Sequence, residues 1–138
     1  MTRDVREILN DLYTSYAAGD FDKYATLIHP DIDWIIQAPM EVFPFAGHRR
    51  GRPAVIEAMT AIAEHYPLER YEREALLVDG DRVAILADAS VRQRATGRTL
   101  RFHVANFLRF RDDMLVELRE FTNTFDVVEQ ALGRWLQV

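Results

Sequence analysis

Residues 83–92 read VAILADASVR and residues 101–110 read RFHVANFLRF, and in both stretches apolar side chains alternate with polar ones. A period of two places the apolar side chains on one face of a strand and the polar ones on the other. Asp79-Gly80-Asp81 precedes the first stretch and Thr96-Gly97 separates the two, and both have the composition of tight turns. The two stretches therefore predict neighbouring antiparallel strands that bury one face.

Three further strands are expected around this pair. Residues 71–78 come before it, and residues 115–124 follow it after a turn at Arg111-Asp112-Asp113. Residues 32–37 form an earlier strand, because apolar and polar side chains alternate there too. A loop rich in proline and glycine follows this earlier strand, so the sheet resumes only later in the chain.

Helices are predicted before the strands. Apolar side chains recur at helical spacing over residues about 3–18, with Thr2 as the N-cap and Gly19 at the end. Asp20 caps a short second helix, which we expect Pro30 to terminate.

A third helix and a last helix complete the expected order of elements. The third carries apolar side chains over residues 55–63 and begins near Pro53, and the last covers residues 127–136. The segment 48–52, His-Arg-Arg-Gly-Arg, reads either as a solvated loop before the third helix or as an anion contact at its start. Helices followed by a run of long strands indicate an α+β fold, and the length of 138 residues fits one domain over residues 1–138.

The pairing of the two central strands depends on the Thr96-Gly97 turn. With a loop of two residues there, Ala87 pairs with Asn106, Ala89 with Val104 and Val91 with Phe102. The apolar faces then coincide, and the small side chains of Ala87 and Ala89 leave space above the sheet for a pocket.

The face shown by the last strand depends on the turn at residues 111–113. A three-residue loop places Val104 opposite Glu120, so that Asn106 and Glu120 are diagonal neighbours on the inner face. A two-residue loop instead turns Glu117, Arg119 and Asn123 inward. We favour the three-residue loop, because it keeps the apolar side chains Val116 and Leu118 inside.

The composition argues against several classes of function. The net charge is −5, which does not suit a nucleic-acid partner, and no apolar run is long enough to cross a membrane. The chain has no cysteine, which excludes thiolate zinc sites and suits a cytoplasmic location. The histidines show no metal-ligand spacing and no glycine-rich phosphate loop is present, so we expect neither metal nor cofactor.

Glu120 and Asn106 are the candidate catalytic residues, because each places a polar group in an apolar row. Burial raises the pKa of a carboxyl, which then serves as a general acid or base near neutral pH. Asn106 has an amide that would hydrogen-bond a carbonyl or oxyanion of the ligand. The structural alternatives are a Glu120 paired to an arginine and an Asn106 satisfied within the core.

Other inward-facing side chains would form the wall of a small-molecule pocket. Tyr13 and Tyr16 lie on the inner stripe of the first helix, and Trp34 lies on the earlier strand. His103 falls on the opposite, polar face of its strand, at the surface or in a subunit interface. The remaining ligand-binding candidates are Ile36, Ala87, Ala89, Phe102, Val104, Leu118 and Thr122.

Five segments, in this order and spacing, resemble the nuclear-transport-factor-2-like superfamily, in particular its SnoaL-like and ketosteroid-isomerase-like branch. The resemblance covers nearly the whole chain and implies a cone-shaped domain, with a curved antiparallel or mixed sheet packed on three N-terminal helices and a short C-terminal helix. It also implies a pocket between the sheet and the first helices. The segments are AAGDFD at 17–22, HPD at 29–31, RGRPAV at 50–55, DGD at 79–81 and NFLRF at 106–110.

Members of this superfamily include isomerases, cyclases, dehydratases and epoxide hydrolases as well as non-catalytic binding proteins. The ketosteroid-isomerase apparatus of one tyrosine and two aspartates is not kept, since Leu12, Ile36 and Asn106 stand at those positions. Residues 119–125, REFTNTF, resemble a stretch of the small phenazine-biosynthesis proteins in which the glutamate is an acid/base residue, and this implies such a role for Glu120. The histidine that those proteins carry on the third helix falls near Ala58 here.

The sequence therefore predicts a pocket that binds a small, mostly apolar molecule and that transfers protons without a cofactor. The alternatives are a binding protein without catalysis and a module that uses the fold only to dimerise. The resemblance further implies a homodimer through the outer face of the sheet, where Asp88, Ser90, Arg92, Arg101 and His103 would lie.

Overall fold

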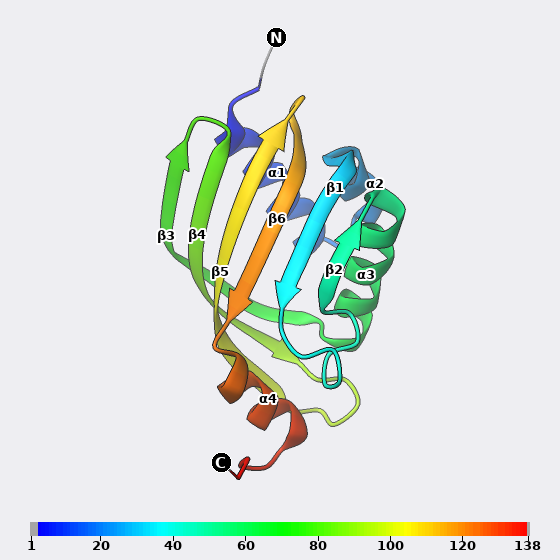
Figure 1. Ribbon diagram of the computed structural model, residues 1–138, viewed down its shortest axis with the longest axis vertical. Helices are drawn as coiled ribbons and strands as arrows, with labels where there is room; N and C mark the ends of the chain where they lie inside the picture. Colours follow the sequence, from blue (N-terminus) through cyan, green and yellow to red (C-terminus); the bar gives the residue numbers. More distant parts are fainter. Residues whose placement is uncertain (1–2, 138) are drawn as a thin grey trace.

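The computed structural model describes residues 3–137, and it shows an α+β fold built on one mixed sheet (Figure 1). The sheet order is β2-β1-β6-β5-β4-β3, with β1 and β6 parallel and every other neighbouring pair antiparallel. The elements are α1 (Val5–Ala17), α2 (Phe21–Thr26), β1 (Ile28–Gln37), β2 (Gly47–Arg50), α3 (Arg52–His65), β3 (Leu68–Asp79), β4 (Arg82–Arg92), β5 (Thr99–Arg111), β6 (Met114–Thr122) and α4 (Thr124–Leu132).

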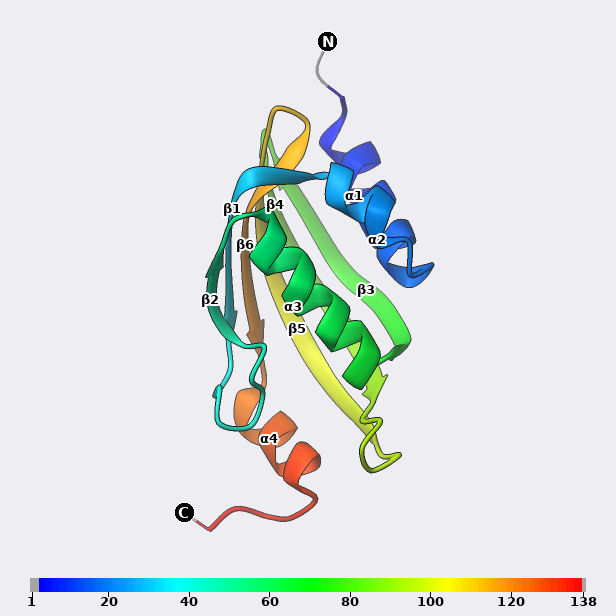
Figure 2. The same ribbon diagram turned by 90° about the vertical axis from the view of Figure 1, so that its right-hand side faces the viewer.

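The sheet is curved, and α1, α2 and α3 cover its concave face while α4 closes one end (Figure 2). The core lies between the helices and this face, and Ile8, Leu9, Ile28 and Leu115 are among its fully buried side chains. The predicted fold class is thereby confirmed. No helix among residues 3–137 is long and apolar enough to cross a membrane.

Several predicted boundaries at the N-terminal end were wrong. The first helix begins after Asp4, whose carboxylate caps it by accepting a hydrogen bond from the Arg6 amide at 2.8 Å; Thr2 lies outside the described residues. Asp20 caps α2 as expected, but Pro30 does not end that helix. The helix ends at Thr26, and Pro30 lies within β1, which starts four residues earlier than the alternation indicated.

The arginine-rich segment before α3 is not a solvated loop, because residues 47–50 form the edge strand β2. Arg49 donates to the carbonyl oxygens of residues 44–46, and Arg52 Nε donates to the Ile28 carbonyl at 2.8 Å. Both guanidinium groups therefore fix neighbouring backbone segments. Backbone carbonyls are their partners, and the other two basic side chains of the segment, His48 and Arg50, pair with the Asp33 carboxylate.

The predicted register of β4 against β5 was wrong by two residues. The connection covers residues 93–98 rather than two residues, and Ile85 pairs with Asn106, Ala87 with Val104 and Ala89 with Phe102. At the start of this longer loop the Gln93 side chain donates to the Ala131 carbonyl of α4 at 3.0 Å. Since the error is an even number of residues, each side chain still points to the predicted face.

The connection from β5 to β6 has the two-residue turn of one alternative from the sequence and the inward-facing Glu120 of the other. The turn has two residues, Asp112 and Asp113, each with positive φ, as in a type I′ hairpin. Val116 has no partner, because Phe110 pairs with Leu115 and Arg109 with Glu117. This β-bulge reverses the facing that a two-residue loop alone would give. Glu120 is thus on the inner face, directly opposite Asn106 rather than diagonal to it.

Candidate functional site

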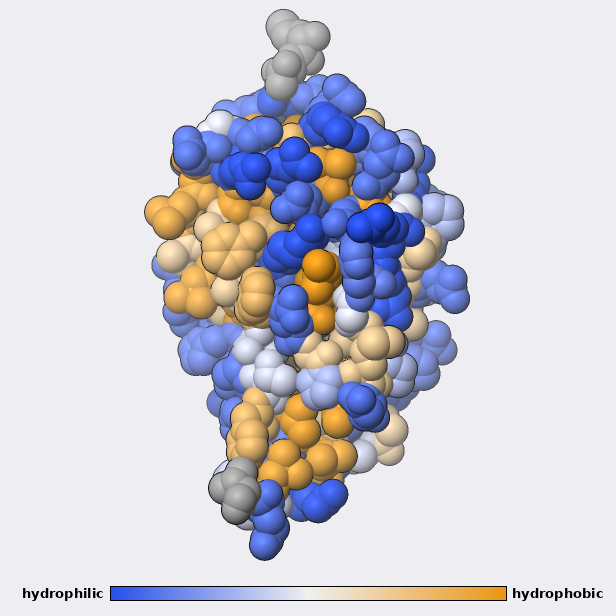
Figure 3. All heavy atoms as spheres, in the orientation of Figure 1, coloured by the Kyte–Doolittle hydropathy of each residue, from blue (hydrophilic) through white to orange (hydrophobic). Residues whose placement is uncertain are grey.

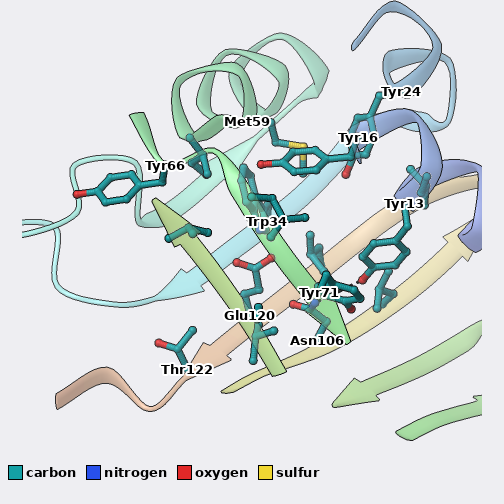
Figure 4. Close-up of a pocket in the computed structure, with 18 of the residues that line it drawn as sticks. Tyr13, Tyr16, Tyr24, Trp34, Met59, Tyr66, Tyr71, Asn106, Glu120 and Thr122 are labelled. Carbon is teal, nitrogen blue, oxygen red and sulfur yellow. Dashed lines mark hydrogen bonds between the residues drawn. The ribbon is translucent and has the colours of Figure 1, made fainter. Parts of the chain in front are cut away.

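A cavity of about 180 Å³ lies between the concave face of the sheet and the three N-terminal helices (Figure 4). Its wall is almost entirely apolar or aromatic. The lining residues are Leu12, Tyr13, Tyr16, Tyr24, Trp34, Met59, Ile62, Tyr66, Leu68, Tyr71, Ala89, Val91, Phe102, Val104, Asn106, Leu108, Leu115, Leu118, Glu120 and Thr122.

Most of the side chains predicted from the sequence as pocket wall do line this cavity, together with Glu120 and Asn106. Ile36 and Ala87 do not. Both face the helices but are buried in the core cluster, because neighbouring side chains fill the space above them. The space expected above Ala87 and Ala89 therefore opens only over Ala89.

The Glu120 carboxyl is held inside the cavity by the register of β6. Its neighbours in the sheet are Asn106 on β5 and Ile36 on β1, and its accessible surface faces the cavity (Figure 4). Among residues 3–137 no arginine or other ion-pair partner engages it, and burial alone raises its pKa from 4.5 to about 7. A carboxyl with this pKa exchanges a proton readily at neutral pH.

Asn106 is buried, and its amide is only half engaged. Its Nδ2 donates to the Tyr13 hydroxyl at 3.4 Å, while its Oδ1 has no hydrogen-bond partner within the described chain. The amide thus keeps its Oδ1 acceptor and the second N–H of Nδ2 unused within the described chain. The donor role expected from the sequence stays a prediction, since Tyr13 takes one of the two N–H groups of Nδ2.

Trp34 is 2 % exposed and packs in the core while its ring also lines the cavity. It pairs with Leu118 across β1 and β6, so it is a diagonal neighbour of Glu120 on the inner face. Its indole Nε1 has no hydrogen-bond partner in the described chain. Trp34 therefore gives the cavity part of its aromatic wall, and its buried indole N–H is unused within the described chain.

Three tyrosines of the wall were missed by sequence reasoning: Tyr24 from α2, Tyr66 after α3 and Tyr71 from β3. Tyr71 stacks on Tyr13 with ring centroids 5.2 Å apart. Tyr71 is the first residue of the strand predicted over residues 71–78. The alternation of that strand would by itself have placed the Tyr71 side chain on the inner face. No local sequence pattern marks Tyr24 or Tyr66 as wall residues, because their positions depend on how the helices cross the sheet.

The tyrosines around Glu120 stay un-ionised at neutral pH. Burial raises the pKa of Tyr16 to about 12, and burial is also the largest cause of the raised pKa of Tyr13, Tyr24 and Tyr71. The negative charge of Glu120 adds to the shift in all four. Four phenols on α1, α2 and β3 therefore lie near one carboxyl.

No lysine, arginine or histidine is found among the residues that line the cavity. Arg73 is an exposed residue whose guanidinium carbon lies 5.6 Å from the centre of the Tyr13 ring. The described part of the chain also brings together no group of three or more His, Cys, Asp or Glu side chains that would hold a metal ion. The cavity thus contains one titrating acid and no opposite charge.

The sequence profile of the SnoaL-like domain matches residues 9–118. No curated protein matches the chain significantly. Among solved structures, a protein from Rhodopseudomonas palustris with a provisional isomerase name is 35% identical and has a TM-score of 0.87, with 97% of this chain and 100% of that chain covered.

Two more distant structures share the fold. A protein from a Jannaschia species with a provisional name as a SnoaL-like polyketide cyclase is 19% identical, with a TM-score of 0.77 and coverage of 95% and 96%. A protein of ketosteroid-isomerase-like fold from Catenulispora acidiphila, solved in complex with trimethylamine, is 16% identical, with a TM-score of 0.76 and coverage of 99% and 100%. With the profile match over most of its length, the chain belongs to the SnoaL-like domain family of the nuclear-transport-factor-2-like fold.

Proposed function

We propose that this protein is a cofactor-free acid/base enzyme of the isomerase, cyclase or dehydratase type, acting on a small and mostly apolar substrate. The single observation that carries the proposal is the Glu120 carboxyl. It faces an otherwise apolar cavity, has no ion-pair partner in the described chain, and has a pKa of about 7. A structural carboxyl is normally paired, and an unpaired one in a cavity is typical of a catalytic group.

Glu120 would transfer a proton to or from carbon or oxygen of the bound molecule. Near pH 7 about half of the molecules carry the proton, so the same group acts as base in one step and as acid in the next. Asn106 and Trp34, whose free Oδ1 and Nε1 are buried, would fix the orientation of the substrate. The apolar wall would exclude water and favour a substrate whose surface is mostly apolar.

The comparisons support a pocket of this kind but leave the substrate open. The relatives carry names as different as isomerase and polyketide cyclase, and one was solved with trimethylamine. One fold thus accommodates several ligands and reactions. The class of ligand has to be argued from the side chains that line this particular cavity.

The test is hydrogen exchange in deuterated water, followed by NMR over a panel of small carbon acids such as cyclic ketones and hydroxylated aromatic compounds. We expect the wild type to exchange protons in one or more of them, and Glu120→Gln to lose at least about 100-fold of that rate. Glu117→Gln, on the outer face of the same strand, is the matched control and should keep the rate. Equal exchange by wild type and Glu120→Gln would refute the role of Glu120.

A binding protein without catalysis is the second candidate. It is favoured by the apolar side chains of Leu12 and Ile36 at positions where ketosteroid isomerases carry their tyrosine and aspartate base. These side chains leave Glu120 as the one acidic side chain that lines the cavity. Tight ligand binding with no exchange by either protein would favour this candidate.

We also propose that the protein forms a homodimer through the outer face of the sheet. Four of the predicted polar positions are neighbours across β4 and β5, Asp88 with His103 and Ser90 with Arg101, although Ser90 is itself buried within the protomer. Beside them is an exposed apolar patch, which Figure 3 shows in orange next to charged side chains. Phe107 is 52% exposed and contacts Phe121 edge-on, and Leu77 and Leu86 extend the patch across β3 and β4. A surface of this kind commonly marks an interface between proteins.

Light scattering at micromolar concentration should give the dimer mass, and Phe107→Glu should give the monomer mass while changing the free energy of unfolding of the protomer little. Met40→Glu, at an exposed apolar position in the loop after β1, is the control and should remain dimeric. A monomeric wild type would count against the interface.

A further inference from the structure

We infer that the natural ligand of this cavity is a small organic amine in its protonated form, which Glu120 and Asn106 accept by hydrogen bonds and which the aromatic wall surrounds. This inference rests on the proposed function, since it names the substrate class for the same site. It follows from three features of the cavity: its paired acceptors, its aromatic faces and its lack of a cation.

The two acceptors come from directly opposed residues on β5 and β6. Asn106 is 5 % exposed, and its Oδ1 has no partner in the described chain. The Glu120 carboxyl beside it is likewise free of ion pairs there. A buried acceptor without a donor costs free energy, so a ligand that brings a donor would stabilise Asn106 Oδ1, and the Glu120 carboxyl in the cavity wall would accept from the same ligand. One ammonium group has enough N–H donors to serve both at once.

The aromatic side chains supply the second feature. Trp34 is a diagonal neighbour of Glu120, and Tyr16 faces the same space from α1 (Figure 4). The face of an aromatic ring carries partial negative charge and attracts a cation within about 6 Å of its centre. Tyr13 already does this, because the guanidinium carbon of Arg73 lies 5.6 Å from its ring centre. Tyr13 also stacks on Tyr71, and the other aromatic rings that line the cavity are those of Tyr16, Tyr24, Trp34, Tyr66 and Phe102.

The third feature is the sign of the charge in the cavity. An anionic ligand would meet the Glu120 carboxylate with no lysine, arginine or histidine in the wall to compensate. A neutral ligand would bring no positive charge to stabilise the Glu120 carboxylate, so the carboxyl would stay protonated at acidic pH. An ammonium group supplies the missing counter-charge and stabilises the ionised carboxylate in a site from which water is largely excluded.

Three probes of similar size and different charge test the inference: benzylammonium, benzyl alcohol and benzoate, titrated by calorimetry at pH 8. We expect benzylammonium to bind at least about tenfold more tightly than benzyl alcohol, and benzoate to bind more weakly than either. Glu120→Gln should remove the preference for the cation. Glu117→Gln, whose carboxylate pairs with Arg109 on the outer face, should keep it.

The affinity for benzylammonium should fall as the pH is lowered through about 7, by at most about tenfold per pH unit, because protons compete with the cation for Glu120. The groups that face Glu120 are Tyr13 and Tyr16 from α1, Tyr24 from α2 and Tyr71 from β3, and all stay un-ionised here since their pKa values are raised. The guanidinium group of Arg73 lies beside Tyr13, with its carbon 5.6 Å from the ring centre. The variant Glu120→Gln should show no such pH dependence.

Equal binding of benzylammonium and benzyl alcohol, or no binding of benzylammonium up to about 10 mM, would overturn the amine as ligand. If Glu120 then still supports hydrogen exchange on a neutral compound, the proposed function stands and only the substrate class is wrong. If Glu120 supports no exchange but the cation preference holds, the site is a binding site for amines and the enzyme proposal fails.

Discussion

Glu120→Gln is expected to stabilise the folded protein by about 3 kcal/mol at pH 8, and to leave its stability at about pH 4 nearly unchanged. The folded-state pKa of Glu120 is about 7, while the unfolded chain titrates near the ordinary value of 4.5. Between these values the folded state binds more protons than the unfolded state. The Glu120 contribution to stability is therefore fully present below pH 4.5 and is lost as the pH rises through 7.

Urea unfolding of both proteins at several pH values, followed by circular dichroism, would measure this difference directly. Other carboxylates, such as the paired Asp33 and Asp88, titrate in both proteins and cancel in the comparison. Glu117→Gln should not stabilise the protein at pH 8, because Glu117 is ion-paired with Arg109 at 3.3 Å. If Glu120→Gln instead lowered the stability at pH 8, Glu120 would have to be a paired structural residue.

Trp34→Ala should destabilise the protein by roughly 3–5 kcal/mol. The ring is 2 % exposed, packs within the core and forms part of the cavity wall, so truncation removes buried apolar area and enlarges an existing cavity. The loss should appear in urea unfolding followed by far-ultraviolet circular dichroism, which does not depend on tryptophan fluorescence.

Trp135 provides the matched control, because it is 83% exposed near the C-terminal end. Trp135→Ala should change the free energy of unfolding by no more than about 0.5 kcal/mol. A cost below about 1 kcal/mol for Trp34→Ala would show that the cavity relaxes around the missing ring, so that Trp34 serves the ligand more than the core.

The sequence was sufficient to predict the fold and the inward facing of Glu120, but not for the same reason in each strand. In β4 and β5 the alternation is so regular that an error of two residues in the register left Ala89 and Asn106 on the correct face. In β6 the inward facing was predicted from the apolar side chains Val116 and Leu118. The actual cause is a two-residue turn together with a bulge, which no local pattern specifies.

What the sequence could not give is contact between distant elements. The parallel pairing of β1 with β6 places Trp34 diagonal to Glu120, yet these residues are far apart in the chain and no hairpin connects their strands. Tyr24 and Tyr66 join the cavity wall because of the way α2 and α3 pack on the sheet. Which polar atoms remain unpartnered, such as Asn106 Oδ1, depends on this packing as well.

Because of the bulge at Val116, the site would keep its geometry after deletion of that residue but not after deletion of a residue further along β6. Loss of Val116 would leave a regular two-residue hairpin in which Arg109 still pairs with Glu117, so Glu120 would keep its place. Loss of one residue between Glu117 and Glu120 would reverse the facing of that carboxyl relative to Asn106. Among relatives that share this site, a gap of one residue is therefore expected beside the turn, whereas the next few positions of the strand should align without gaps.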